Sequence, residues 1–203
     1  MVDWTSILAG WYPEIENGEN DVATLCSNCL SLIGDECDRM PMSEQDVTQG
    51  LINSWVLLGL EYAQGAQGVT ALYLYAGSEP NHQYANIFFE QDGQVLYPSK
   101  LSGVDVHPHR MLDMQKCMIE DLIQAEVAFR ELAVPCPTEY RITYEPGPGR
   151  LDVQLSREVK YADHPVKTLQ SGPEDWLVGR LEPVVGKLLP PERRWLRFRR
   201  EHR

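Results

Sequence analysis

Apolar residues recur every three or four positions between residues 20 and 37, which is the spacing of one face of an α-helix. The recurring positions are Val22, Leu25, Cys26, Cys29, Leu30 and Ile33. Gly34 follows the last of them, and glycine suits a helix C-terminus because it adopts positive φ without steric cost. The pattern therefore predicts an amphipathic helix that ends at Gly34.

A second helix is predicted to begin after Ser43. The hydroxyl of Ser43 can accept a hydrogen bond from a free backbone N–H, and Asp46 adds a favourable negative charge near the helix start. The apolar face of this helix is predicted to carry Val47, Leu51, Trp55, Leu58 and Tyr62. The helix is expected to stop near Gly65, so residues 1–65 are predicted to form a helical unit.

The pattern changes at Val69 to runs of β-branched and aromatic residues, which are typical of strands. Residues 69–76 and 84–97 contain these runs, and Asp92-Gly93 within the second run is a hairpin turn signal. Three antiparallel strands are therefore expected.

A further pair of strands is predicted in residues 141–161, separated by the turn Pro146-Gly147-Pro148-Gly149. Proline fixes φ and glycine permits positive φ, so this sequence ends one strand and starts the next. Side chains alternate about the expected strands. One face is predicted to be buried and to carry Ile142, Tyr144, Leu151, Val153 and Leu155.

Helical spacing returns between the two groups of strands and again near the end of the chain. The longer helix is predicted to end before Pro135 and to bury Met111, Met114, Met118, Leu122, Ala125, Phe129 and Leu132. A short helix over residues 173–185 is expected to place Trp176, Leu177 and Leu181 on one face.

These elements predict an α+β fold in the order ααβββαββα, with an antiparallel sheet packed against the long helix. A single domain is expected over residues 1–190, with the acidic helical unit in 1–65 and the sheet and long helix in 69–185. Residues 191–203 are predicted to form a separate basic tail.

Charge is distributed unevenly over the 203 residues, whose net charge is −12. Residues 1–99 contain 14 acidic side chains and one base, Arg39, whereas the remainder is nearly neutral. An acidic field attracts a basic partner and repels nucleic acid, although it also serves solubility. The candidate partner-binding residues are Glu14, Glu16, Glu19, Asp21, Asp35, Glu36, Asp38, Glu44 and Asp46.

The sequence has five cysteines and no start typical of a secretion signal, so we expect a cytoplasmic chain with reduced thiols. Cys26 and Cys29 have the spacing of zinc and redox sites, and Cys37 follows eight residues later. Both lie on the apolar face of the predicted helix, where cysteine acts as a small hydrophobic residue. A structural role is favoured over zinc or redox chemistry.

His107 and His109 stand beside Asp105 just before the long predicted helix. A metal site would need a further ligand from another loop, such as His82 or His164, so an exposed turn is the favoured interpretation. We therefore expect no metal, no cofactor and no catalytic residues.

The tail interleaves arginines with Trp195 and Phe198, as nucleic-acid-binding and membrane-surface segments do. It can equally fold back on the acidic first half of the chain or face a partner. A role within the chain or towards a protein partner is favoured over nucleic-acid or membrane binding, so nucleic acid and membrane are not expected partners.

Residues from about Leu72 to Glu182 resemble the YezG-like family of bacterial immunity proteins and antitoxins. The likeness lies in an ordered set of segments: "LYLYAGSEPNHQYANIFFEQDGQVLYPSKL", "CMIEDLIQAEVAFRELAV", "EYRITYEPGPGRLDVQLSREVKY" and "EDWLVGRLEP". The resemblance implies a protein that binds and neutralises a cognate toxin domain, often a nuclease, in competition between bacteria.

Three functions remain open on the sequence. The favoured one is an immunity protein that occludes a basic surface of its toxin, because opposite charge accelerates association. The second is an acidic adaptor or chaperone that escorts a secreted effector. The third, less favoured, is an enzyme that uses the loop with His107 and His109.

Overall fold

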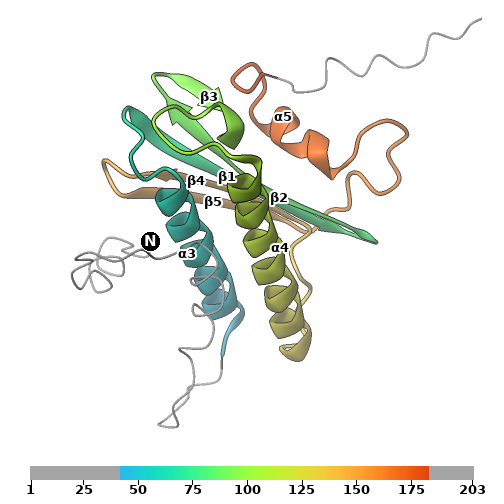
Figure 1. The fold of residues 1–203 in the computed structure, drawn as a ribbon. Helices are drawn as coiled ribbons and strands as arrows, with labels where there is room; N and C mark the ends of the chain where they lie inside the picture. The colour runs from blue at the N-terminus through green and yellow to red at the C-terminus, as the bar shows by residue number, and fades with distance from the viewer. Residues whose placement is uncertain (1–41, 183–203) are drawn as a thin grey trace, which may run out of the picture.

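The computed structural model describes residues 42–182 of the chain. The fold is α+β, as predicted, with five antiparallel strands in the order β3-β2-β1-β4-β5 (Figure 1). The elements are α3 (Glu44–Tyr62), β1 (Val69–Glu79), β2 (His82–Gln91), β3 (Gln94–Leu96), α4 (Pro108–Glu131), β4 (Glu139–Glu145), β5 (Arg150–Ser156) and α5 (Gly172–Trp176). The predicted helix over residues 22–34 and the predicted tail over 191–203 lie outside the described residues.

Helix α3 begins where the sequence predicts. The Ser43 hydroxyl accepts a hydrogen bond from the Asp46 N–H at 3.2 Å, and the Asp46 carboxylate accepts one from the Ser43 N–H at 2.8 Å. These reciprocal bonds satisfy two backbone donors that a helix start leaves without partners. Of the predicted apolar face, Leu58 is half-buried and the other four residues are buried: Val47, Leu51, Trp55 and Tyr62.

Tight turns set the order of the strands. Asp92 (φ 52°) and Gly93 (φ 78°) join β2 to β3 with positive φ at both positions, the conformation of a type I′ hairpin turn. The predicted proline-glycine turn joins β4 to β5, and Glu145 faces Arg150 at its base. Because β1 pairs with β2 on one side and with β4 on the other, it lies at the centre of the sheet.

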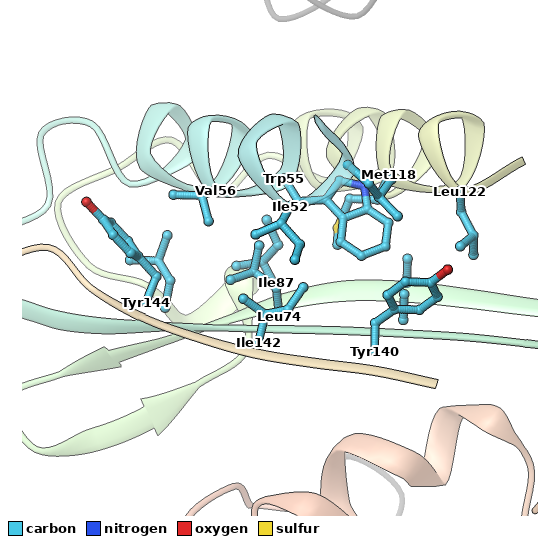
Figure 2. Close-up of a cluster of buried hydrophobic side chains, with 14 of the residues drawn as sticks. Ile52, Trp55, Val56, Leu74, Ile87, Met118, Leu122, Tyr140, Ile142 and Tyr144 are labelled. Atoms are coloured by element: carbon cyan, nitrogen blue, oxygen red, sulfur yellow. The ribbon is translucent and has the colours of Figure 1, made fainter. Parts of the chain in front are cut away.

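The main core lies between the sheet and two helices, α3 and α4, which cover the same face (Figures 1 and 2). Trp55 of α3 is fully buried, and its ring meets that of Tyr140 on β4 edge-on, with ring centroids 5.6 Å apart. Each large apolar side chain buried here contributes about 1.5–3 kcal/mol. Most of the predicted stripe of α4 lies in this core, where Met114, Met118, Leu122, Ala125 and Phe129 are buried. Leu132 packs against the core from just after α4, and Met111 is half-buried.

The opposite face of the sheet is covered in part by residues 157–182, which include α5. The predicted helix over residues 173–185 is wrong in extent, because α5 ends at Trp176. Gly179 adopts a positive φ of 74°, and Leu181 forms an isolated bridge with Val95 of β3, so the chain has left the helical path by that point. A second apolar cluster forms here and includes Leu177, Leu181 and half-buried Trp176. These are the three residues predicted to lie on one apolar face.

None of the helices within residues 42–182 is both long enough and apolar enough to span a lipid bilayer.

Candidate partner-binding surface

Two of the nine acidic residues predicted to bind a partner, Glu44 and Asp46, lie in the first turn of α3. The other seven fall outside the described residues: Glu14, Glu16, Glu19, Asp21, Asp35, Glu36 and Asp38. Of the nine residues, the structure therefore gives positions for Glu44 and Asp46 alone, at the start of α3.

Glu44 and Asp46 each have a local structural partner. Glu44 forms an ion pair with Arg157, which follows β5, and both side chains remain nearly half exposed. Hydrogen bonds from the Ser43 side chain and backbone hold the pKa of Asp46 below its ordinary value. Both carboxylates stay at the surface, so their structural roles leave them accessible to a partner.

A groove lies between the first half of α3 and strand β5. Its volume is about 350 Å³, and it is lined by Glu44, Gln45, Thr48, Gln49, Ile52 and Val153. Ile52 is buried and Val153 half-buried, so the groove has an apolar floor below a polar rim. Sequence reasoning did not find this groove, because it depends on the distance between a helix and a strand about 100 residues apart along the chain.

Within residues 42–182, strand β5 forms an edge of the sheet and pairs with β4 on one side only. Its predicted apolar face is incompletely covered, because Leu151 and Val153 are half-buried and Leu155 is 41% exposed. The expectation that Leu155 is buried is therefore wrong, and the position of β5 at the edge is the reason. Open edges expose unpaired backbone groups that can pair with another chain.

The charged groups around this edge are more acidic than basic. Six carboxylates and four basic groups lie on the first turn of α3, in the β4–β5 hairpin and just after β5: Glu44, Asp46, Glu139, Glu145, Asp152, Glu158, Arg141, Arg150, Arg157 and Lys160. Arg150 pairs with Glu145, and Arg157 with Glu44. Asp46, Asp152 and Glu158 remain as exposed carboxylates without a basic partner in the described residues.

A second hollow, of about 440 Å³, lies where α4 and β1 end, and Pro80, Val134 and Thr138 contribute to its wall. Glu126 lies within it and accepts hydrogen bonds from Ser78 and Gln83. Cys136 also lines this hollow, and burial raises the pKa of its thiol. The thiol is therefore protonated at neutral pH, which makes it a poor nucleophile.

The histidine loop forms the start of α4. The rings of His107 and His109 stack with centroids 5.0 Å apart, and the His107 Nδ1 accepts from the His109 backbone N–H as a helix cap. Within residues 42–182, no group of three or more histidine, cysteine, aspartate or glutamate side chains is placed to hold a metal ion.

The cysteines differ from one another. Cys136 is a free thiol, 3.5 Å from the Tyr140 hydroxyl. Cys117 is buried on α4. The expectation of reduced thiols is therefore confirmed for Cys136. Cys26, Cys29 and Cys37 lie outside the described residues.

Two buried carboxylates, which the sequence did not single out, hold residues 160–162 against the sheet. Glu79 accepts hydrogen bonds from three consecutive backbone N–H groups, those of Lys160, Tyr161 and Ala162. Glu139 accepts from the side chains of Lys160 at 2.6 Å and Arg141 at 2.8 Å. These contacts anchor the segment that follows β5 and begins beside the groove.

Burial and hydrogen bonding act in opposite directions on Glu139. Burial favours its protonated form, but the hydrogen bonds from Lys160 and Arg141 outweigh burial and hold the pKa of Glu139 below its ordinary value. Burial also raises the pKa of neighbouring Tyr75, whose hydroxyl donates to Glu139. The cluster is therefore an ionised carboxylate surrounded by donors.

The sequence matches no family model, and no curated protein matches it either.

Proposed function

We propose that this chain is an immunity protein that binds and neutralises a cognate toxin domain, and that it does so by occluding a basic surface of the toxin. The observation that carries the proposal is the net charge of the residues that the structure describes. Residues 42–182 contain twenty acidic and ten basic side chains, so an excess of ten negative charges lies on the described domain. A nuclease is the toxin class that the resemblance implies, and nucleases present basic surfaces to nucleic acid.

The physical reason is electrostatic steering. Opposite charges on two proteins raise the rate of their encounter, and the same field repels nucleic acid from the complex. An inhibitor of this kind needs a rigid scaffold that presents the charge. The sheet with α3 and α4 on one face supplies such a scaffold, and Glu44 and Asp46 stand at one end of it.

An acidic adaptor or chaperone for a secreted effector is the alternative, and the same charge supports it. The two functions differ in one outcome, because an adaptor binds its effector without blocking the effector's activity. The test must therefore measure toxin activity as well as binding.

The experiment is co-expression in a bacterial host with the toxin domain encoded beside this chain's gene. We expect cells to survive when both proteins are made and to die when the toxin domain is made with an unrelated protein of equal net charge. Cell death despite a stable complex would favour the adaptor, and the absence of any complex would overturn both functions.

A further inference from the structure

We propose that the open edge of β5 and the groove beside it form a strand-addition site, which receives an extended basic segment of the protein partner as a sixth strand. This inference rests on the proposed function, because it names how the partner is held. Of the predicted acidic residues within 42–182, Glu44 lines the groove of this site.

The backbone of β5 provides the first part of the site. In a strand, successive residues direct their N–H and C=O groups to opposite sides, so about half of the backbone groups of β5 point away from β4. In residues 42–182, no other strand pairs with that side. An added strand would satisfy these groups and gain most of its binding free energy from main-chain hydrogen bonds.

The groove provides the second part. A strand added at the usual spacing of about 4.8 Å from β5 would run beside the first half of α3. Every second side chain of that strand would point towards the helix, above Ile52 and Val153. Its apolar side chains would fill the groove of about 350 Å³ and cover Leu155, which is now 41% exposed. The partner segment therefore needs alternating apolar positions.

Charge decides which chain can occupy the site. The carboxylates around the edge exceed the basic groups by two, and Asp152 projects from β5 itself on the face away from α3. A second copy of this chain brings a net charge of −12, and residues 1–41 carry eight acids against one base. Both are repelled by the edge, whereas a segment with basic side chains opposite Asp152 is attracted to it.

The test is an NMR titration of the full chain with two synthetic peptides of seven residues. One alternates lysine and valine (KVKVKVK) and the other alternates glutamate and valine (EVEVEVE). We expect the lysine peptide to shift the amide resonances of β5 and of the first half of α3, and the glutamate peptide to shift neither. Equal shifts with both peptides, or lysine-peptide shifts elsewhere on the chain, would overturn the inference.

Two variants block the site in different ways. Thr48→Trp fills the groove, and Leu155→Lys places a positive charge at an exposed position on the edge. Each should weaken lysine-peptide binding by about tenfold or more, equivalent to about 1.4 kcal/mol. Gln124→Trp, which adds the same bulk to an exposed position of α4, is the matched control and should bind the peptide like the wild type.

Amide hydrogen exchange of the free protein tests whether β5 is already covered by another segment of this chain or by a second copy. If residues 1–41, the basic residues 183–203 or a second copy cover β5, its outward-pointing amides will be protected in the free protein, and the inference fails. Co-expression with the toxin separates the two proposals. A Thr48→Trp chain that folds and protects cells as fully as the wild type would overturn strand addition and leave the immunity function intact.

Discussion

The backbone N–H of Tyr161 lies 3.0 Å from each carboxylate oxygen of Glu79, although 82 residues separate them in the sequence. Glu79 ends the central strand β1 and is 7% exposed. It receives the N–H of Lys160 at 2.7 Å as well. One buried carboxylate therefore fixes the point at which the chain after β5 turns onto the second face of the sheet.

Replacement of Glu79 by alanine should release this segment. Three backbone N–H groups would lose a charged acceptor, so we expect a loss of about 2–3 kcal/mol in the free energy of unfolding. The amides of residues 160–162 should also exchange faster with solvent. Asp163→Ala, at an exposed position in the same loop, is the control and should change neither quantity. An unchanged exchange rate at Tyr161 would contradict this role for Glu79.

Replacement of Glu139 by glutamine should destabilise the fold in a pH-dependent manner. The pKa of Glu139 is lowered from 4.5, so its ionised form stabilises the fold above that pH, and the contribution is lost as pH falls through the folded pKa. We expect a cost of about 1–3 kcal/mol at pH 7, less than for a fully enclosed pair because Lys160 is one-third exposed.

Denaturant unfolding at several pH values measures that difference. The gap between the wild type and Glu139→Gln should narrow as pH falls below 4.5. Glu145→Gln is the control, because its partner Arg150 is 71% exposed, and it should cost less than about 1 kcal/mol. A gap that stays constant down to the acid transition would contradict the assignment.

The substitution Asp121→Asn should stabilise the fold at neutral pH. Burial raises the pKa of Asp121, and the hydrogen bond from Ser54 Oγ at 2.6 Å opposes that rise in part. The folded protein therefore holds the Asp121 proton more tightly than the unfolded chain does, so ionisation of Asp121 lowers stability as pH rises through the folded pKa.

The stabilisation by Asp121→Asn should be largest above the folded pKa and should vanish below the ordinary value of 3.8. Thermal unfolding at pH 7 and at pH 3.5 measures both limits. Asp113→Asn, at an exposed position on the same helix, should have little effect at either pH. Destabilisation at pH 7 would show that the charge of Asp121 is needed for its bond to Ser54.

Most elements of the described fold could be predicted from local patterns. Ser43 with Asp46 fixes the start of α3, and Asp92-Gly93 fixes the turn between β2 and β3, because each signal acts within four residues. The extent of α5 could not be predicted in this way. The apolar spacing of Trp176, Leu177 and Leu181 suits a helix, but the bridge from Leu181 to Val95 takes the chain out of it.

The candidate site was less accessible to sequence reasoning. Charge predicted an acidic partner-binding surface, and Glu44 and Asp46 are the two residues of that prediction within 42–182. The groove depends on the packing of α3 beside β5, and the exposure of Leu155 depends on β5 lying at the edge. The anchoring of residues 160–162 by Glu79 involves no sequence motif, because the donors are backbone groups of any residue type.

Neutralisation of acidic residues in clusters should slow association with a basic toxin. Exposed single charges contribute at most about 1 kcal/mol per pair, so Asp35, Glu36 and Asp38 should be changed together to their amides. Stopped-flow measurement should then show a lower association rate at low salt and a smaller change in dissociation. An unchanged association rate for the folded variant would contradict a role for these residues in steering.

The most direct test of the immunity function is a titration of the purified toxin domain with the full chain while toxin activity is measured. We predict complete inhibition at one chain per toxin domain, with an association rate that falls steeply as salt is raised. Exposed charges are screened beyond about 8–10 Å at physiological ionic strength, which is why salt should act mainly on association. A toxin domain that keeps its activity in the saturated complex would contradict the proposed function.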